Sequence, residues 1–565
     1  MPDIQDAMVV EKPPKWIQGL HEFVTVNAAT GYALASGKPG VALIDRVVGT
    51  QNSVGAFYIA YLNCSPTVVF ASSNVPGVPI PTGETEYHYV GNQPGFVAPW
   101  VKWFTEVESL DTLPEDVEKA FFMATSVHPG PTYVTLRQDL MAQRVQRARA
   151  FESELPHPSP RIPDDETLNK IVDELLTHRH PVVIVSHMGR NPEAVPRLVD
   201  FAHTFGLPVK ERRVFMNYPM DDPMHAGFVS RALTPELPPK TDLVVLLETG
   251  LLPHQRFSDN IDAIDLTSDQ YHRQDVYEGG DYGSSLIPAT VRSVCDAEPT
   301  LKKLVEIAQD KIGPAEKSII DDRSHSVIEQ HHEMVQEWRD NAKLSYEAGV
   351  LDGWSVGYTL KMHWSQNTIW VNGSVTPSET LTKALELSQP GTYFGNPSGH
   401  LGATLGMAYG VALAHRHYVD VQDKGTHKVG RISGSTDAVV CTTGDGDAIF
   451  GNIDSALWTC SHYGLGVLYV VMNNAAWGIE WPPIARSSQH WAKLASDFEF
   501  VDLDNPRIDF AQLAKAYSVH SQTVQTPQEF DSALKECLIK VRSGKPALLN
   551  VVMQKYTGPQ PSAVP

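Results

Sequence analysis

The stretch Thr442–Glu480, TTGDGDAIFGNIDSALWTCSHYGLGVLYVVMNNAAWGIE, decides the fold class of this chain. A short apolar run at 438–441 precedes it, a segment of helical length follows, and a second apolar run occupies 467–472. The order strand, turn, helix, strand is typical of a parallel sheet. Gly444–Gly446 and Asn473–Asn474 each follow one of the two predicted strands. Because ligands of open α/β sheets bind at the carboxyl ends of the strands, we expect a site there.

Asp445 and Asn474 carry the oxygen atoms that hard divalent cations prefer. A carboxylate and an amide carbonyl suit Mg²⁺ or Ca²⁺ better than a soft metal, and Mg²⁺ usually also takes phosphate oxygens. The glycines at 444 and 446 let the backbone approach such a phosphate closely. A lone Gly-Asp-Gly turn or Asn-Asn loop is common without any ligand. The two together, on consecutive strands, predict a phosphate and metal site.

GDG followed at this spacing by NN resembles the fingerprint of thiamine-diphosphate (ThDP) enzymes, the superfamily of benzoylformate decarboxylase, pyruvate decarboxylase and acetolactate synthase. SALWT (455–459) resembles a segment of benzoylformate decarboxylase. NNAAWGIE (473–480) resembles the NNxGYxIE motif of pyruvate decarboxylases. The resemblance implies that Asp445, Asn474 and the carbonyl of Ala476 bind the metal. The cofactor-binding residues that it implies are Asn52, Ser374, Val375, Thr376, His400, Leu401, Gly444, Gly446, Asp447, Ala448, Trp477 and Gly478.

Glu22 belongs to a second motif, HEFVTVNAATGYA. We expect it at the end of a short strand at 17–20, where the apolar neighbours Phe23 and Val24 partly withdraw its carboxyl from water. The segment resembles the HE-x-x-A-x-x-x-A-x-GYA pattern of ThDP enzymes, and GTQN (49–52) matches an early loop of the same domain. The resemblance implies that Glu22 hydrogen-bonds the aminopyrimidine and so promotes deprotonation of the thiazolium C2. Fewer residues precede Glu22 than in most members, so an N-terminally short domain is expected.

Three further side chains are catalytic candidates. His88, in ETEYHYVGNQPGF, resembles the second histidine of the HHxxGNxxxF loop of pyruvate decarboxylases, with Tyr87 in place of the first, and is suited to orient or protonate an enolate-like intermediate. His254, in ETGLLPHQRF, matches an active-site histidine of benzoylformate decarboxylase. A solvated loop histidine is the alternative for both. Glu480 matches a glutamate of pyruvate decarboxylases that lies near the reacting carbon.

The order of predicted strands and helices indicates an α/β chain of three doubly wound parallel-sheet domains. We expect a pyrimidine-binding domain at 1–150, a central Rossmann-like domain at 166–310, a linker at 311–351 and a diphosphate- and Mg²⁺-binding domain at 352–565. A proline-rich stretch, LPHPSPRIPDD, marks the first boundary. In the central domain no G-x-G-x-x-G opens a helix, so the sequence gives no support for FAD, which some members of the family bind there.

Composition narrows the class of protein further. The net charge is −21 without a cluster of Lys or Arg, which argues against a nucleic-acid partner and against an anionic membrane surface. No apolar run is long enough to predict a membrane span. The five cysteines are scattered without a CxxC motif, and the first residues have no apolar signal region. These features predict a cytoplasmic protein with reduced thiols.

Together the motifs predict a ThDP- and Mg²⁺-dependent C–C lyase. The first hypothesis is non-oxidative decarboxylation of a 2-oxo acid, followed by release of an aldehyde or by ligation to a second carbonyl compound. The alternatives are an acetolactate-synthase-like or 2-hydroxyacyl-CoA-lyase-like carboligase, and a catalytically degenerate relative that binds ThDP without turnover. The resemblance also implies a homodimer or homotetramer in which Glu22 and Asp445 of one site come from different chains.

Overall fold

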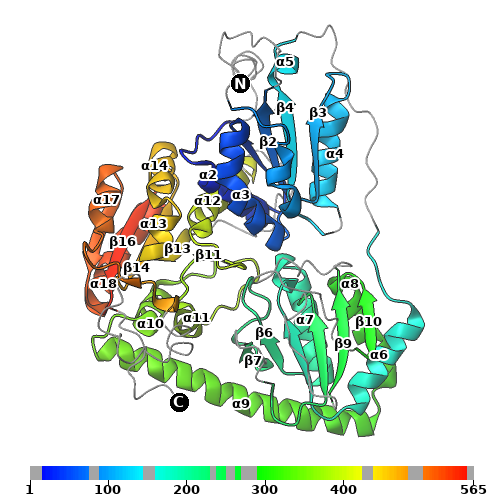
Figure 1. Cartoon of the computed structure of the whole chain (residues 1–565). Coiled ribbons are helices and arrows are strands. Elements are labelled where there is room, and N and C mark those ends of the chain that lie inside the picture. The colour runs from blue at the N-terminus through cyan, green and yellow to red at the C-terminus, as the bar shows by residue number, and fades with distance from the viewer. Residues whose placement is uncertain are drawn as a thin grey trace, which may run out of the picture. The chain divides into compact units, whose positions relative to one another are not determined.

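The computed structural model describes residues 15–74, 88–126, 128–143, 159–229, 237–249, 261–268, 289–422, 437–480 and 501–555. The chain forms two compact units. The first comprises 1–157, 367–378 and 399–565, and the second comprises 158–366 and 379–398. Three parallel sheets are found, two in the first unit and one in the second, which confirms the predicted fold class (Figure 1).

The first sheet of the first unit has the order β1-β2-β4-β3. Its strands are β1 (Gly40–Ile44), β2 (Thr67–Ser73), β3 (Trp103–Val107) and β4 (Thr132–Arg137). The accompanying helices are α2 (Glu22–Ser36), α3 (Arg46–Leu62), α4 (Leu113–Thr125) and α5 (Gln138–Met141). Helix α2 ends at Ser36, because Gly37 adopts the left-handed conformation, with φ 71°, that closes a helix.

The strand expected at 17–20 is wrong: residues 15–20 have no regular structure, and Glu22 is the first residue of α2. Two side chains of α14 (Ile453–Tyr463) explain the difference. The backbone N–H of Gln18 donates to Tyr463 Oη at 2.8 Å, and Thr459 Oγ1 donates to the Gln18 carbonyl at 3.3 Å. Side chains thus satisfy the backbone groups that a neighbouring strand would have satisfied.

The second sheet of the first unit contains the order β11-β13-β14-β16-β15. Its strands are β11 (Thr368–Asn372), β13 (Ala438–Gly444), β14 (Val467–Asn473), β15 (His520–Val524) and β16 (Ala547–Val552), and its helices are α12 (Ala403–Gln422), α13 (Asp445–Phe450), α14, α17 (Phe510–Ala516) and α18 (Pro527–Arg542). Strands β13 and β14 are neighbours, with Gly444 opposite Met472. Their carboxyl ends therefore lie side by side, as the sequence predicts. The single expected helix between them is divided at Asn452, whose φ is 56°.

Helices α2 and α12 lie side by side and meet backbone to backbone (Figure 1). A Cβ atom on Gly31 would lie 2.1 Å from the Met407 carbonyl oxygen, and one on Gly406 would lie 2.2 Å from that of Val24. A Cβ on Gly410 would lie 2.0 Å from the Ala28 carbonyl oxygen. Only glycine permits this approach. Because almost every residue of α2 is buried, the helix is part of the core and has no solvated face.

The second unit contains a sheet of order β10-β9-β8-β5-β6-β7. Its strands are β5 (Pro181–Val185), β6 (Val209–Glu211), β7 (His225–Phe228), β8 (Leu243–Leu247), β9 (Asp262–Thr267) and β10 (Val291–Val294); β12 (Tyr393–Gly395) also belongs to this unit. Its helices are α6 (Asp165–Thr177), α7 (Ala194–Phe205), α8 (Ala297–Lys311), the long α9 (Pro314–Glu347), α10 (Gly353–His363) and, apart from its first residue, α11 (Ser378–Leu385). Strands β5 and β8 are buried along their whole length, as expected for a sheet covered on both faces.

Two general properties bear on the class of protein. In the described ranges, no helix has the length and apolar character needed to cross a bilayer. All five cysteines are buried and free. The predicted cytoplasmic location stays a prediction.

The packing of α2 on α12 generates a stability prediction for Gly406→Ala. Helix propensity alone would make alanine stabilising by about 1 kcal/mol. We expect the opposite sign, a loss of at least about 1–3 kcal/mol in the free energy of unfolding, because the new methyl group meets the Val24 carbonyl. Urea unfolding of both proteins measures it. Gly91→Ala is the control, since its nearest neighbour, Tyr89 Oη, is 3.8 Å away. Equal stability of Gly406→Ala and the parent chain would contradict the described packing.

Candidate functional site

The Glu22 carboxylate is held at the first turn of α2 by helix α3. His21 caps α2 by accepting the Phe23 N–H on its Nδ1 at 3.2 Å. Asn52 Nδ2 donates to Glu22 Oε2 at 3.1 Å, and a Cβ on Gly49 would lie 3.1 Å from Oε1. Gly49 and Asn52 are one helical turn apart, so both face the carboxylate. The side chain of Glu22 is half-buried, in agreement with the expectation of partial withdrawal from water.

The segment after β11 brings polar backbone and hydroxyl groups together. Asn372 Oδ1 accepts from the Ser374 N–H at 3.0 Å and from Thr442 Oγ1 at 2.9 Å. The hydroxyls of Ser374 and Thr404 are buried and have no hydrogen-bond partner. A Cβ on Gly373 would lie 2.2 Å from Thr404 Oγ1. Two buried hydroxyls without partners, beside a glycine, fit a ligand with many acceptor oxygens, such as a diphosphate.

Asp445 begins α13 at the end of β13 and is 4 % exposed. Its Oδ1 accepts from the Gly446 N–H at 2.9 Å, whereas its Oδ2 is buried without a partner. Burial raises the pKa of Asp445 to about 6, although the backbone N–H groups of Gly446, Ala475 and Ala476 act in the opposite direction. An ionised oxygen buried without a donor costs free energy. A divalent cation would remove that cost, so the carboxylate fits the predicted metal.

The other two predicted metal ligands lie in the turn that follows β14. Asn474 is buried, and its Oδ1 accepts from the Ala476 N–H at 3.2 Å. Ala475 has a φ of 55°, which turns the chain back, and the Ala476 carbonyl accepts from the Gly478 N–H at 2.9 Å. Each of these oxygens has a second lone pair. Gly444 pairs with Met472, so Asp445 and this turn follow the adjacent ends of β13 and β14.

Asp447 lies two residues further along and is engaged differently. Its Oδ1 accepts from the Gly402 N–H at 2.7 Å, and its Oδ2 accepts from Thr443 Oγ1. Burial raises its pKa to about 6 as well. Gly402, with φ 81°, contacts Gly451 so closely that a Cβ would lie 2.0 Å from the Gly451 Cα. The Asp447 carboxylate therefore joins the start of α12 to α13.

The remaining cofactor-binding candidates surround these groups in the first unit. The Trp477 ring covers Gly446, where a Cβ would lie 2.4 Å from Trp477 Cζ3. The His400 ring stacks on Phe23 at 5.0 Å between centroids. Gly478 lies beside Thr376, whose Oγ1 would be 2.9 Å from a Cβ there. Gly444 and the half-buried Val375 and Leu401 occupy the adjoining turns, and Ala448 is fully buried on α13.

The contacts connect the two predicted motifs into one region. From Glu22 the path runs through the neighbouring Phe23 to His400, then along the chain to Gly402 and across to Asp447. Asp447 lies on the same short helix as Asp445. All these contacts are made within a single chain. The prediction that different chains contribute Glu22 and Asp445 stays a prediction.

Glu480 and His88 are both exposed. Glu480 is exposed at the end of the 3₁₀ turn η5 (Gly478–Glu480), where its N–H donates to the Trp477 carbonyl at 3.1 Å. His88 is exposed, with φ 65°. His254 lies outside the described residues. Their roles stay predictions.

Four residues were missed by sequence reasoning: Phe23, Gly55, Asn372 and Thr443. Asn372 holds the Ser374 loop, and Thr443 donates to Asp447. The sequence offered one signal, the position of both residues at or near the carboxyl end of a buried strand.

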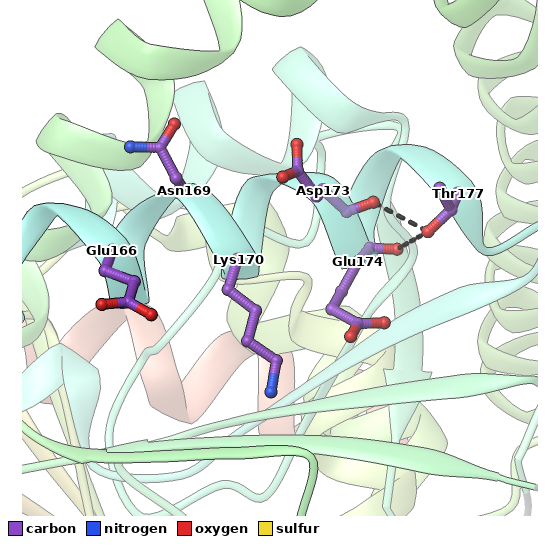
Figure 2. A pocket seen from close by; sticks show the side chains of 6 residues that line it. All are labelled: Glu166, Asn169, Lys170, Asp173, Glu174 and Thr177. Atoms are coloured by element: carbon purple, nitrogen blue, oxygen red, sulfur yellow. Dashed lines mark hydrogen bonds between the residues drawn. The ribbon is translucent and has the colours of Figure 1, made fainter.

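A hollow along α6 in the second unit has no relation to this chemistry. Figure 2 shows that one helix supplies its lining, which comprises Glu166, Asn169, Lys170, Asp173, Glu174 and Thr177. Thr177 Oγ1 donates to the Asp173 and Glu174 carbonyl oxygens of the same helix. The hollow is therefore the solvated face of an amphipathic helix.

In the described part of the chain, no group of three His, Cys, Asp or Glu side chains is arranged to hold a metal. The Asp445 site would use amide and backbone oxygens instead.

Comparison with known proteins identifies two segments of this chain that match cofactor-binding domains. The model of the thiamine pyrophosphate enzyme N-terminal TPP binding domain matches residues 1–76, and that of the C-terminal TPP binding domain matches residues 375–551. Benzoylformate decarboxylase of Pseudomonas aeruginosa is 24% identical over 551 residues, which cover 96% of this chain and 92% of the relative. The acetolactate synthase large subunit of Haemophilus influenzae is 22% identical over 561 residues, covering 94% and 87%.

A solved structure shows the same fold. Thiamine diphosphate-dependent 4-hydroxybenzoylformate decarboxylase of Rhodococcus jostii RHA1 aligns with a TM-score of 0.71 and 20% identity, covering 97% of this chain and 94% of that one. Both ends of the chain match the two cofactor-binding domains, and those ends contain Glu22 and Asp445. The chain therefore belongs to the family of thiamine-diphosphate-dependent enzymes.

Proposed function

We propose that this protein is a ThDP- and Mg²⁺-dependent C–C lyase that decarboxylates a 2-oxo acid without oxidation and releases an aldehyde or joins it to a second carbonyl compound. One observation carries the proposal. Contacts join the half-buried Glu22 carboxylate, oriented by Asn52, to the region of the buried Asp445 carboxylate, one oxygen of which lacks a partner. A carboxyl for the aminopyrimidine and a carboxyl for the metal are what the cofactor requires.

Bound ThDP would supply the nucleophilic carbon and accept the electron pair that C–C cleavage releases. In our proposal Asp445, Asn474 and the Ala476 carbonyl would hold Mg²⁺. The buried Ser374 hydroxyl, which has no partner in the described structure, would donate to a phosphate oxygen. Glu22 would accept a hydrogen bond from the aminopyrimidine, and Asn52 keeps the carboxylate oriented. The Trp477 ring excludes water from Gly446.

A second candidate function is that of an acetolactate-synthase-like carboligase, and the similarity to the acetolactate synthase subunit favours it. The experiment is a screen of pyruvate, branched-chain 2-oxo acids and benzoylformate with the purified chain, ThDP and Mg²⁺. Carbon dioxide release with free aldehyde supports the decarboxylase, and a 2-hydroxy-ketone or acetohydroxy acid product supports the carboligase. Cofactor binding without turnover of any substrate would contradict both and favour a degenerate relative.

Metal binding is tested by Asp445→Asn. Without ligands we expect the variant to unfold at the same temperature as the parent or higher, because an ionised oxygen without a partner is removed. ThDP with Mg²⁺ at 100 times its dissociation constant should stabilise the parent by about 2.7 kcal/mol and the variant hardly at all. Scanning fluorimetry measures both. Asp447→Asn is the matched control: it has similar burial but two engaged oxygens, so it should lose stability with or without ligand. A full cofactor response in Asp445→Asn would refute the metal assignment.

Glu22 and Glu480 are tested in the same assay. Glu22→Gln should lower kcat by about 10²–10⁴-fold, the range of a lost acid–base group, while ThDP still binds. If Glu480 supplies the proton of the aldehyde, Glu480→Gln should slow aldehyde release and leave the affinity for ThDP intact. Steady-state kinetics measures the turnover rate, and calorimetric titration measures the affinity for ThDP. Unchanged turnover in Glu480→Gln would remove this residue from the mechanism.

We propose further that the protein is a homodimer or homotetramer whose sites combine Glu22 of one chain with Asp445 of another. Heterodimers of Glu22→Gln and Asp445→Asn chains, isolated with two affinity tags, test this arrangement. If the halves of each site come from different chains, one of the two sites in the heterodimer is intact, and about half of the parent activity returns. If each site is built within one chain, as α2 and α12 pack in the structure, both sites stay defective.

A further inference from the structure

His400 lies where the two halves of the proposed site meet. Its ring stacks on Phe23, with 5.0 Å between centroids and 27° between planes, and meets the Phe450 ring edge to face at 5.9 Å. Phe23 directly follows Glu22, and Phe450 ends the helix that Asp445 begins. One aromatic side chain therefore contacts both the Glu22 helix and the Asp445 helix.

Helix α3 provides a space for this ring. A Cβ on Gly55 would lie 2.2 Å from His400 Nε2 and 2.8 Å from its Cε1, and its three nearest atoms all belong to His400. Gly49, Asn52 and Gly55 follow one another at intervals of three residues, which places them along one side of the helix. The first two face the Glu22 carboxylate, and the third receives the imidazole.

The segment that carries His400 is fixed at its other end. The Gly402 N–H donates to Asp447 Oδ1 at 2.7 Å, and Gly402 and Gly451 touch through their backbones. His400 Nδ1 lies 3.2 Å from the Leu401 carbonyl oxygen of its own segment. The ring is thus held from α13 and presented to α2 and α3.

We propose that His400 is a positioning residue: its ring, lodged beside Gly55, holds the first turn of α2 so that Glu22 faces the cofactor. This inference rests on the proposed function, and it assigns to His400 an action through Phe23 that is separate from holding ThDP. The effect depends on the shape and contacts of the ring. It is therefore the same whether α2 and α12 belong to one chain or to two.

The test uses His400→Ala, Gly55→Ala and the double variant. Alanine at 55 expels the ring from its space, so each single variant should loosen the first turn of α2. In the double variant the new methyl group meets no imidazole, so it should behave like His400→Ala alone. His332→Ala, an exposed histidine on α9 in the second unit, is the control.

The first readout needs no cofactor. Hydrogen–deuterium exchange of the ligand-free chain should increase in the peptide covering 21–33 in both single variants and stay unchanged over α4. The double variant should not exceed His400→Ala. Unchanged exchange at 21–33 in His400→Ala, or additive increases in the double variant, would overturn the proposal.

The second readout is deuterium exchange at C2 of ThDP bound at saturation, followed by NMR. We expect it to slow about 10- to 100-fold in His400→Ala and Gly55→Ala, because Glu22 is misplaced, with little change in the affinity for ThDP. A weaker affinity for ThDP with normal C2 exchange at saturation would make His400 a cofactor contact only and overturn the positioning role. If the parent chain binds no ThDP, the proposed function fails, while the first readout still decides whether His400 restrains α2.

Discussion

The candidate site depends on the contact of α2 with α12, in which the two backbones approach each other closely. Gly31, Gly406 and Gly410 let the two helices approach until carbonyl oxygens would touch any added methyl group. Helices packed this closely cannot shift far relative to each other, because protein interiors are packed so densely that a change of one methylene group already disturbs them. Glu22 at the start of α2 and the turn before α12 are therefore fixed relative to each other.

Asp445 and Asp447 share one environment but differ in their hydrogen bonds. Both are buried in the same short helix, and burial raises the pKa of each to about 6. They differ in their partners: Asp447 has a donor for each oxygen, whereas Asp445 Oδ2 has none. A satisfied buried carboxylate stabilises the fold, and an unsatisfied one suggests a ligand. The two carboxylates are therefore distinguished by the hydrogen bond that Asp445 Oδ2 lacks, and not by their burial.

Much of this could be predicted from the sequence, for reasons that are local. Strands β13 and β14 are short apolar runs bounded by turn residues, and adjacent parallel strands bring Asp445 and Asn474 together. The strand expected at 17–20 was wrong because its backbone groups are satisfied by Tyr463 and Thr459, more than 400 residues away. No local pattern reveals such partners. The space that Gly55 leaves for His400 is equally invisible in the sequence, since a helical glycine alone predicts nothing about what lies against it.

The unpartnered oxygen of Asp445 also bears on the life of the protein before it meets its cofactor. If Asp445 holds Mg²⁺ as proposed, a chain that folds without the cation must bury a charge or keep a proton there, and either state is less stable than the loaded one. Locally open forms are then more populated, and proteases act on such forms. The abundance of this protein should therefore depend on the supply of Mg²⁺ and ThDP. When either is scarce, faster degradation should shorten the lifetime of the protein.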